Sequence, residues 1–453
     1  MKLKIDSRKI EKGDTFLALR GVDIDGHDFI ASAIKNGASK IIAEHGNYEV
    51  ETEIVKDTRK YLSDFLKKYY KEAIKNVKLI GITGTNGKTT TAYLVHKAFN
   101  NLGIKAAYIG TIGFYVDQKI RNLNNTTPDL YEVYQMIDEA YKMGCSVVVM
   151  EVSSQGIAHH RIMGMKFDIA LFTNLTQDHL DYHKTMENYA LAKRELFKQL
   201  TGIKSAIVNY DDSYKDYYLL KENNNITYGF TGGNYHILEY NTSMKGTTFK
   251  FEYNKKQYNV HTLLFGKFNI YNSISVIAIL KEYGFSMEEI IESFNKLNAP
   301  VGRLDTINYK DNLIIVDYAH TPDAIINIFS TVLELKPNNI YTVFGATGDR
   351  DRTKRPIMTK LVLSNSKYAI ITNDDPHNED PKHIIDDLLE GNKLTNYEVQ
   401  LDRKKAIKIG IDKLKHNDLL LILGKGHEEF MIIKNEKIPM NDKKIVLDYL
   451  ENK

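Results

Sequence analysis

The chain has 453 residues, 43% of them hydrophobic and 26% charged, and this composition is ordinary for a soluble globular protein. A chain of this length is too long for one hydrophobic core, so about three domains are expected. The net charge of +3, with both signs interspersed, gives no support for nucleic acid as the main partner. The single cysteine, Cys145, excludes a disulfide within the chain and a multi-thiolate metal site.

The sequence carries no signal for secretion or membrane insertion. The N-terminus, MKLKIDSRKIEKGD, lacks the apolar core of a signal peptide. No uninterrupted apolar run approaches the ~20 residues of a membrane span. We therefore expect a cytoplasmic protein with no membrane partner and no nucleic-acid partner, and we expect a monomer.

Short apolar runs alternate with helical patterns along the chain, which is typical of α/β architecture. A small N-terminal domain ends at the Lys/Tyr-rich helix KYLSDFLKKYYKEAIK. Residues 226–265 contain shorter, partly alternating runs, which predict an antiparallel patch attached to a parallel sheet. The strands predicted before this patch are 77–83, 105–110, 145–151, 167–173 and 205–210.

A second boundary is predicted near residue 300. Helices expected at 269–283 and 286–297 lead into NAPVGRLDTI, where Pro300 and Gly302 interrupt the regular patterns. Beyond it, NLIIVDYAH, NIYTVFGA, YAIITNDD and DLLLILGKG are each typical of a strand followed by a loop, which predicts a second open α/β domain. The expected domains are 1–75, 76–300 and 301–453.

The stretch GITGTNGKTTT (81–91) joins a predicted strand to a predicted helix. It nearly matches the phosphate-loop pattern G-x-x-x-x-G-K-[ST], but Ile82 stands where the pattern has its first glycine. Unobstructed backbone N–H groups, a helix N-terminus and Lys88 suit nucleotide phosphates, and the Thr89 hydroxyl suits Mg²⁺. The alternative is an ordinary strand-to-helix turn capped by threonines. The flanking strand and helix favour the phosphate loop.

Polar residues follow several other predicted strands, at the edge where open parallel sheets bind ligands. Glu151 is either a ligand of a divalent cation or a helix cap or surface acid. His179 and His183, in LFTNLTQDHLDYH, belong either to a hydrogen-bonded loop or to a cation–phosphate site. Composition alone makes Lys193, on a predicted helix, a solvated or salt-bridged lysine.

Three loops of the C-terminal region carry comparable residues. Asp317 and His320 follow a strand in VDYAHTPDAI, a suitable ligand-binding turn. GKGHEE (424–429) is only weakly similar to a phosphate loop, because no Ser or Thr follows Lys425. In GATGDRDRTKRP, four cations either bind anionic groups or form a solvated basic loop: Arg350, Arg352, Lys354 and Arg355.

Together these motifs resemble the Mur ligases, and within that family the branch that adds the third, diamino acid to the peptidoglycan precursor. The family's nucleotide loop reads T-G-T-N-G-K-T-[TS], with the glycine spacing found here. A folylpolyglutamate or cyanophycin-type ligase would lack the DSR…DGH N-terminal domain, and a nucleotide-dependent switch without ligase activity is a further alternative. Ordered matches cover nearly the whole chain: DSRKIEKGDTFLALRG, DGHDFI, TTPD, EVSSQGI with HR, TNLTQDHLDYH, GKFNIYN, GRLD, DYAHTPDA, GDRDRTKRP and GKGHE.

The resemblance implies three α/β domains: a small N-terminal domain that binds the uridine nucleotide, a central P-loop ATPase, and a C-terminal Rossmann-like domain that closes over it. The implied cofactors are ATP and Mg²⁺, and the implied substrates are small molecules. The activity it implies begins with phosphorylation of the D-glutamyl carboxylate of UDP-MurNAc-L-Ala-D-Glu by ATP. The amine of a diamino acid then displaces phosphate and forms an amide.

The resemblance also implies roles for individual residues. The UDP-MurNAc-dipeptide would contact Ser7, Arg8, His27, Thr126, Thr127, Ser153, Gln155 and Arg161. ATP would contact Gly84, Thr85, Asn86, Gly87, Lys88, Thr89, Thr90, Asn269, Asn272, Arg303, Asp317 and His320. The metal would be held by Thr89, Glu151, His179 and Lys193, the last after carbamylation, and the catalytic residues would be Lys88, Lys193 and His179. The amino-acid substrate would contact Arg350, Asp374, Asp375, His377, Gly424 and Glu428.

The amino-acid specificity depends on one departure from the family pattern. Relatives specific for meso-diaminopimelate carry the motif Asp-Asn-Pro-Arg, whose arginine binds the second carboxylate of that amino acid. Here the stretch is DDPH (374–377), followed by Glu379 and Asp380. A neutral histidine cannot make the forked contact, and acidic surroundings suit a terminal ammonium. We therefore expect L-lysine or L-ornithine, with meso-diaminopimelate or lanthionine as the alternative.

Overall fold

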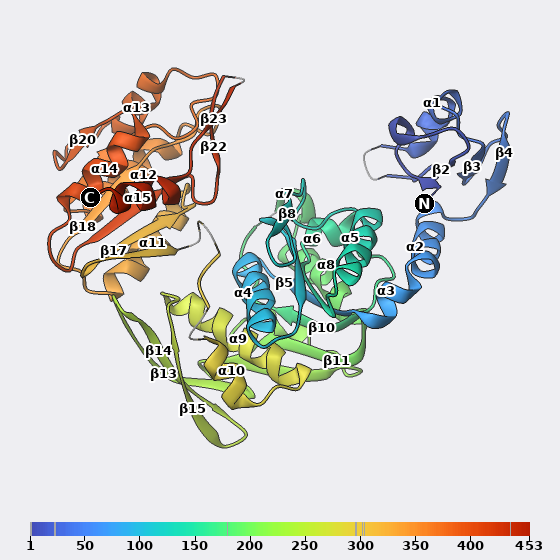
Figure 1. Cartoon of the computed structure of the whole chain (residues 1–453), viewed down its shortest axis with the longest axis horizontal. Helices are drawn as coiled ribbons and strands as arrows, with labels where there is room; N and C mark the ends of the chain where they lie inside the picture. The colour runs from blue at the N-terminus through green and yellow to red at the C-terminus, as the bar shows by residue number, and fades with distance from the viewer. Residues whose placement is uncertain are drawn as a thin grey trace. The chain divides into compact units, whose positions relative to one another are not determined.

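The computed structural model describes residues 2–21, 24–178, 180–294, 297–300, 302, 304–434 and 436–453. The chain forms two compact units, drawn together in Figure 1. The first comprises Met1–Gly233 with Ser275–Phe285, and the second comprises Asn234–Ile274 with Ser286–Lys453. No helix in the described ranges is long and apolar enough to cross a membrane.

The N-terminal part of the first unit is a four-stranded, fully parallel sheet in the order β1-β2-β3-β4. Phe16, Ile30 and Ile41 are buried in its small core. Two helices, α2 and α3, lead from this sheet to the next one. The elements are β1 (Leu3–Lys4), β2 (Thr15–Leu17), α1 (Ile30–Lys35), β3 (Lys40–Ala43), β4 (Glu51–Ile54), α2 (Thr58–Tyr69) and α3 (Lys71–Asn76).

The rest of the first unit is built on a parallel sheet in the order β12-β11-β10-β5-β9-β6, which the antiparallel strands β7 and β8 extend. Its central strands are apolar on both faces, as expected for a parallel sheet covered by helices. Its strands are β5 (Lys78–Thr83), β6 (Ala106–Gly110), β7 (Gly113–Tyr115), β8 (Lys119–Arg121), β9 (Val147–Glu151), β10 (Phe167–Phe172), β11 (Leu200–Asn209) and β12 (Asn224–Gly229). Its helices are α4 (Lys88–Asn101), α5 (Leu130–Lys142), α6 (Ser154–Ala158), α7 (Leu180–His183) and α8 (Met186–Lys198).

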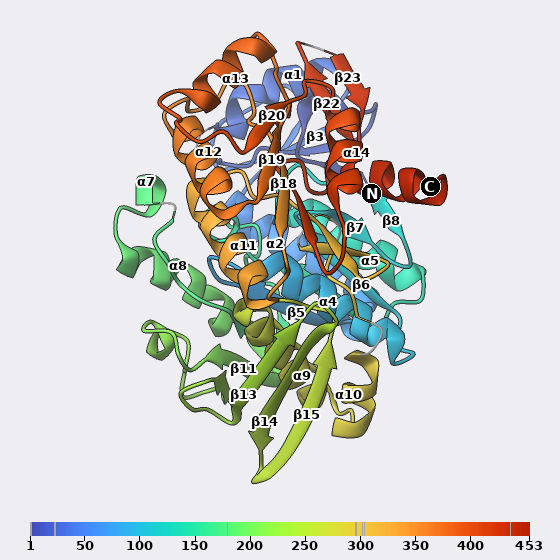
Figure 2. The same cartoon turned by 90° about the vertical axis from the view of Figure 1, so that its left-hand side faces the viewer.

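The second unit begins with three antiparallel strands that lie side by side in Figure 2: β13 (Tyr235–Ser243), β14 (Gly246–Tyr253) and β15 (Lys256–Thr262). The helices α9 (Lys267–Tyr283) and α10 (Met287–Phe294) follow. The predicted antiparallel patch therefore exists, but the prediction was wrong for its first segment. All but the last residue of NITYGF lie in β12, which pairs with β11 in parallel.

A six-stranded sheet forms the rest of the second unit, in the order β16-β17-β21-β18-β19-β20, parallel except for β16. The chain crosses this sheet in one direction from β17 to β20 and then returns to place β21 between β17 and β18. Open α/β sheets bind ligands beyond the carboxyl ends of such strands. The strands are β16 (Asp305–Tyr309), β17 (Asn312–Asp317), β18 (Ile340–Phe344), β19 (Tyr368–Ile371), β20 (Tyr397–Val399) and β21 (Leu419–Leu423). The remaining elements are α11 (Pro322–Glu334), α12 (Lys354–Asn365), α13 (Pro381–Leu389), α14 (Arg403–Lys413), the hairpin β22 (Phe430–Ile433) and β23 (Glu436–Pro439), and α15 (Asp442–Glu451).

The α/β fold class is confirmed, and the domain bounds proposed from the sequence stay a prediction. The long apolar strands were predicted within a few residues. The sequence did not reveal β1 to β4, β7, β8, β16, β20, β22 and β23, because very short strands and strands at sheet edges or in hairpins carry little periodic signal.

Candidate functional site

Residues 84–87 form the turn between β5 and α4, and glycine is required at both ends of it. Gly87 has φ +86°, and Gly84 has φ +149° with Thr173 packed where a Cβ would lie. The turn is held by the loop after β10, because Asn86 N donates to Asn174 Oδ1 (2.9 Å) and Thr173 Oγ1 donates to Asn86 O (2.7 Å). The N-terminus of α4 therefore follows a rigid, glycine-rich turn, and the two together suit a phosphate group. We call residues 84–87 the phosphate turn.

Two lysines converge on one carbonyl of this turn. Lys88 Nζ donates to Gly84 O (3.0 Å) and Thr85 O (2.9 Å), and Lys193 Nζ, from α8, donates to Gly84 O (2.8 Å). Lys193 is only 1% exposed, so it is not a solvated lysine. Burial, followed by the charge of Lys88, lowers the pKa of Lys193 well below its usual value, although Asp178 opposes the shift. Lys193 is therefore poised to be a neutral, nucleophilic amine.

Glu151, at the end of β9, is fully buried and surrounded by donors. Its Oε2 accepts from Thr89 Oγ1 (2.8 Å) and Thr111 Oγ1 (3.2 Å), and its Oε1 accepts from Thr111 N (2.9 Å) and from the Tyr108 hydroxyl. Burial and the Glu151 charge raise the pKa of Tyr108 well above its usual value, so the phenol stays a donor. Glu151 is thus not a surface acid but a preorganised carboxylate beside Thr89. Thr90 is half-buried in the first turn of α4.

His179 lies outside the described residues, so its proposed metal and catalytic roles stay predictions. His183 is buried at the end of α7, with Nε2 3.0 Å from Ser154 Oγ and its ring stacked on Tyr189. Tyr189 in turn lies 3.2 Å, hydroxyl to hydroxyl, from Thr85. His183 therefore belongs to a hydrogen-bonded support of the phosphate turn.

Four of the residues predicted for the dipeptide lie next to Glu151. Thr127 Oγ1 donates to Glu151 O (3.0 Å) and accepts from Ser153 N (2.9 Å), while Arg161 Nη1 donates to Thr127 O (2.9 Å). Thr126 Oγ1 is 3.0 Å from the hydroxyl of Thr111. Gln155 is exposed on α6.

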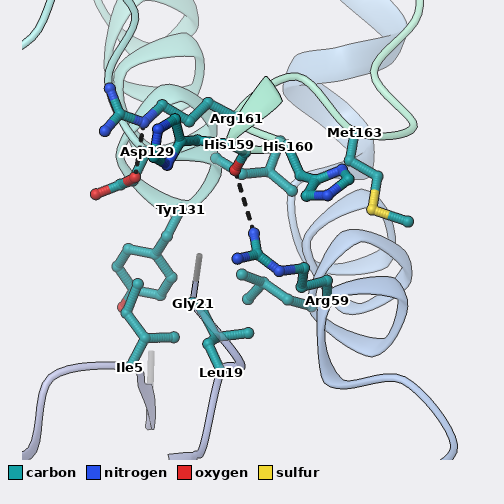
Figure 3. Close-up of a pocket in the computed structure, with 12 residues that line it drawn as sticks. Ile5, Leu19, Gly21, Arg59, Asp129, Tyr131, His159, His160, Arg161 and Met163 are labelled. Carbon is teal, nitrogen blue, oxygen red and sulfur yellow. Dashed lines mark hydrogen bonds and ion pairs between the residues drawn. The ribbon is translucent and has the colours of Figure 1, made fainter. Parts of the chain in front are cut away.

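Arg161 also lines a cavity of about 200 Å³ between α2, the β2 region and the segment after α6 (Figure 3). Arg59 reaches into it from α2, donating through Nη1 to His159 O (3.1 Å) and through Nε to Arg20 O (2.7 Å). Arg161 Nε pairs with Asp129 Oδ1 at 3.2 Å.

Three residues of the N-terminal domain that were predicted to contact the UDP-MurNAc-dipeptide do not line this cavity: Ser7, Arg8 and His27. Ser7 is buried, and exposed Arg8 pairs with Asp6 through Nη2 and Oδ2 (2.9 Å). His27 Nε2 accepts from Glu44 N (2.9 Å), and its Nδ1 lies 2.6 Å from Asp25 Oδ1. With Nε2 as acceptor, the proton of the neutral ring is on Nδ1.

In the second unit, the loops after β17, β18, β19 and β21 surround a cavity of about 300 Å³. Tyr318, His320 and Lys354 line it as well. The structure thus brings together all six residues that were predicted for the amino-acid substrate: Arg350, Asp374, Asp375, His377, Gly424 and Glu428.

A buried lysine lies directly behind the carboxylates of this cavity. Lys425 Nζ donates to Asp375 Oδ1 (2.8 Å) and Glu428 Oε2 (2.7 Å) and lies 3.9 Å from Asp374 Oδ1. Burial alone would lower the pKa of Lys425, but these three carboxylates raise it instead. Burial raises the pKa of Asp374 and of Glu428. Among the described residues, these three acids form the only cluster of His, Cys, Asp or Glu with metal-binding spacing, and Lys425 already occupies it with positive charge.

Two of the four cations in GATGDRDRTKRP are used within the protein. Arg355 is buried and pairs with Glu379 (2.9 Å) and Asp387 (2.7 Å), and Arg352 pairs with Asp387 (2.8 Å). Asp380 accepts from Lys382 N as the cap of α13. The acidic surroundings that favoured an ammonium ligand are therefore largely neutralised.

The residues predicted to complete the ATP site have the following contacts. Asn269 Nδ2 donates to Phe265 O (2.8 Å), and buried Asn272 donates to Asn269 Oδ1 (2.9 Å). Asp317 accepts from Leu304 N (2.7 Å) and Ala319 N (2.8 Å). His320 is exposed, and Arg303 lies outside the described residues.

Several supporting residues were not found from the sequence. Tyr108 and Thr111 hold Glu151, Arg59 lines the first cavity, and Lys425 pairs with the acids of the second. Only Lys425 lay within a recognised motif, GKGHEE, where its pairing with two carboxylates was not foreseen. The others show no local pattern, because their contacts join distant segments.

Comparison with known proteins places these sites in context. The Mur ligase middle domain matches residues 82–280, the Mur ligase glutamate ligase domain 302–426, and the Mur ligase family catalytic domain 2–72. The chain is 40% identical to the UDP-N-acetylmuramoyl-L-alanyl-D-glutamate--2,6-diaminopimelate ligase of Fusobacterium nucleatum, over 98% of this chain and 92% of that protein. The protein of the same name from Aquifex aeolicus is 38% identical over 99% of this chain and 93% of that one.

Solved structures show the same relationship. The structure of a UDP-N-acetylmuramoyl-L-alanyl-D-glutamate--2,6-diaminopimelate ligase is similar with a TM-score of 0.79 and 31% identity, over 99% of this chain and 94% of that chain. A folylpolyglutamate synthase of Mycobacterium tuberculosis has a TM-score of 0.62 at 15% identity, over 81% of this chain and 92% of that chain. The second likeness concerns the fold alone.

Proposed function

The chain belongs to the Mur ligase family, and from this premise we propose that it joins a diamino acid to UDP-MurNAc-L-Ala-D-Glu. It has the three-domain α/β fold of that family, with proposed bounds of 1–75, 76–300 and 301–453, and it is an ATP-dependent amide ligase. The observation that carries the proposal is the convergence of Lys88 and Lys193 on Gly84 O, beside the Thr89–Glu151 pair. We propose that it acts in the cytoplasm as a monomer.

The reaction requires activation of a carboxylate, because oxide is a poor leaving group. Transfer of the ATP γ-phosphoryl group to the D-glutamyl carboxylate gives an acyl phosphate and ADP, with phosphate as the new leaving group. The N–H groups of residues 84–87 and the ammonium of Lys88 hold the ATP phosphates and stabilise their charge during transfer. The amine of the incoming amino acid then attacks the acyl carbon, and the tetrahedral intermediate collapses to amide and phosphate.

The residues beside Lys88 fit a magnesium site. Thr89 and Glu151 present the hydroxyl and carboxylate oxygens that Mg²⁺ prefers, and their hydrogen bond shows that they converge. When bound, Mg²⁺ supplies positive charge that offsets the charge of the phosphates. We assign His179 to the same site.

Lys193 completes this site in carbamylated form. Its neutral amine forms an N–C bond to CO₂ and releases a proton, which converts the side chain into an anion with two oxygens. The lowered pKa favours this step, because a protonated lysine has no lone pair with which to attack. Carbamylation also removes a buried positive charge next to Lys88.

The muramoyl-dipeptide is assigned to the surface next to Glu151. Thr126, Thr127, Ser153 and Arg161 offer hydroxyl and guanidinium donors there, within reach of the phosphate turn. A carboxylate of the dipeptide is recognised by such charge-assisted hydrogen bonds. Gln155, Ser7, Arg8 and His27 are assigned to the more distant parts of the same substrate, and Asn269, Asn272, Arg303, Asp317 and His320 to ATP.

We propose 2,6-diaminopimelate as the amino acid, bound in the cavity lined by Arg350, Asp374 and His377. The relatives named above act on this compound according to their names. The expectation of L-lysine or L-ornithine depended on an excess of acidic charge. Lys425, Arg350 and Lys354 balance the three carboxylates around the cavity, so that basis is lost. A balanced cavity suits a ligand with two ammonium and two carboxylate groups.

The test is a panel of amino acids offered to the purified protein with ATP, Mg²⁺ and UDP-MurNAc-L-Ala-D-Glu. Phosphate release and product mass should show the tripeptide with meso-diaminopimelate, and much less with L-lysine or L-ornithine, while lanthionine, which carries the same charged groups, is the closest competitor in the panel. Preferential use of L-lysine would overturn the specificity and leave the ligase assignment intact. Phosphate release that does not depend on any amino acid, without a peptide product, would instead favour a nucleotide-dependent switch.

A folylpolyglutamate-type ligase is the alternative within the same fold. Residues 2–72 match the Mur ligase family catalytic domain, and the presence of this segment favours a uridine-nucleotide substrate. Glutamate addition to a folate by the purified protein would contradict this preference.

A further inference from the structure

We infer that Lys425 is a specificity-determining residue, which sets the net charge of the amino-acid cavity without touching the amino acid. The inference deepens the proposed function and depends on it for the identity of the ligand class. Lys425 follows β21, in GKGHEE, and its side chain is 0% exposed. It does not line the cavity, so its effect passes through the acids that do.

The contacts of Lys425 connect three different segments. Its ammonium binds Asp375 Oδ1 (2.8 Å) from the loop after β19 and Glu428 Oε2 (2.7 Å) from its own loop. Asp375 Oδ1 also accepts from Ile432 N (2.8 Å) in β22. Each of the two carboxylates therefore gives one oxygen to Lys425, and the Asp375 oxygen is shared between Lys425 and the backbone of β22.

The charges on the walls of this cavity are balanced. Asp374, Asp375 and Glu428 are opposed by Lys425 from behind and by Arg350 and Lys354 on the lining. A second buried pair, Arg403 with Asp442, is neutral by itself. Removal of Lys425 would leave an excess of one negative charge in a largely buried space, where charge interactions are weakly screened.

The balance of charges in the cavity discriminates between two kinds of diamino acid by their net charge. A diamino acid with a second carboxylate is neutral overall at pH 7, whereas L-lysine and L-ornithine each carry a net positive charge. An excess negative charge attracts the cationic amino acids and repels the distal carboxylate. Lys425 therefore disfavours the binding of L-lysine, because its charge offsets the acids that would otherwise attract this cationic amino acid.

The experiment compares Lys425→Met, which keeps the length of the chain and removes the charge, with the double variant Lys425→Met/Asp375→Asn, which restores the balance. The readout is the ratio of kcat/KM for meso-diaminopimelate to that for L-lysine. We expect this ratio to fall roughly tenfold or more in Lys425→Met. In the double variant the ratio should return most of the way to the wild-type value, even if total activity is lower.

Asp375→Asn alone keeps the inference testable if Lys425→Met fails to fold. It leaves one excess positive charge, so the ratio should rise above the wild-type value. Lys425→Arg keeps the charge and should keep the ratio. An unchanged ratio in Lys425→Met, or an equal fall in the single and double variants, would overturn the inference, the second because it would indicate lost packing.

Calorimetric binding of each amino acid alone to the wild type and the four variants separates this inference from the proposed function. A wild type that makes no tripeptide would refute the ligase assignment, and the binding ratios would still test the role of Lys425. Binding ratios that do not follow the charge of the variants would overturn the inference even in an active ligase.

Discussion

Lys193 and Lys425 are both fully buried, and they differ in what surrounds them. Lys193 has a carbonyl and a second lysine as neighbours and no ion pair with any described carboxylate, so its pKa is lowered. Lys425 has three carboxylates within 4 Å, and its pKa is raised. Burial by itself therefore does not decide the charge of a lysine; the partners decide it. The surroundings of Lys193 therefore favour its neutral form, and those of Lys425 favour its charged form.

The largest expected effect is at the first site. Lys88→Ala removes the ammonium beside the phosphate turn, and turnover should fall by at least about 10³-fold, because transferred phosphate charge is left without its counter-charge. Phosphate release measures this loss. Lys97→Ala, on the same helix α4, is the matched control, and its activity should stay within about twofold. Substantial ligase activity in Lys88→Ala would contradict the assigned role.

The lowered pKa of Lys193 leads to the next prediction. Lys193→Ala should lose roughly 10²-fold in kcat, since the site loses an anion that positions the phosphates and their metal. In the wild type, removal of CO₂ should lower activity, and bicarbonate near pH 7 should restore it. Intact-protein mass should show one added CO₂ in the active form. Lys198→Ala, which changes an exposed lysine of α8 and leaves Lys193 intact, should keep both the activity and the CO₂ response of the wild type. Activity that is independent of CO₂ would refute the carbamate.

A smaller effect on catalysis is expected from the loss of the Thr89 hydroxyl, and two variants distinguish the role of this hydroxyl from that of the methyl group. Thr89→Ala should weaken the apparent affinity for Mg²⁺ by about 10–100-fold, because Glu151 loses a donor and the metal loses an oxygen. Thr89→Ser keeps the hydroxyl and should stay near the wild type. The Mg²⁺ dependence of phosphate release measures both. Equal Mg²⁺ dependence of the two variants would show that the hydroxyl has no role.

The smallest effect concerns stability in the second unit, where charges are paired. The hydrogen bonds from Arg355 lower the pKa of Glu379 from 4.5 to about 2, although burial opposes the shift. A lowered carboxylate pKa stabilises the folded state above the ordinary pKa, and this stabilisation is lost as the pH falls from about 4.5 toward 2. Arg355→Met should cost roughly 1–3 kcal/mol near pH 7.

Denaturant unfolding over this pH range measures the difference between Arg355→Met and the wild type. The difference should shrink as the pH falls, because the wild type then loses the ion pair that the variant lacks at every pH. Lys382→Met, on exposed α13, is the control and should show no such trend. A constant difference at all pH values would mean that Arg355 acts by packing alone.

Much of the fold was predictable because its signals are local. Apolar strands such as 77–83 and 145–151, and the glycines around Lys88, follow from periodicity and from backbone conformations that only glycine adopts easily. The six residues that line the second cavity were named through the family resemblance, and the strand pattern had already placed each of them after a predicted strand of the C-terminal region. The sequence did not show which charges of that group are already paired.

The alternation of strands and helices, the phosphate turn at 84–87 and the membership of a ligase family were determined by the sequence alone, since each depends on residues close together in the chain. Only the tertiary structure decided that Arg355 is unavailable to a ligand, that Lys193 is poised to lose its charge and that Lys425 keeps it. Lys193 meets Gly84 across 109 residues, and Lys425 meets Asp375 across 50. Burial and charge state depend on such distant partners, and no local pattern encodes them.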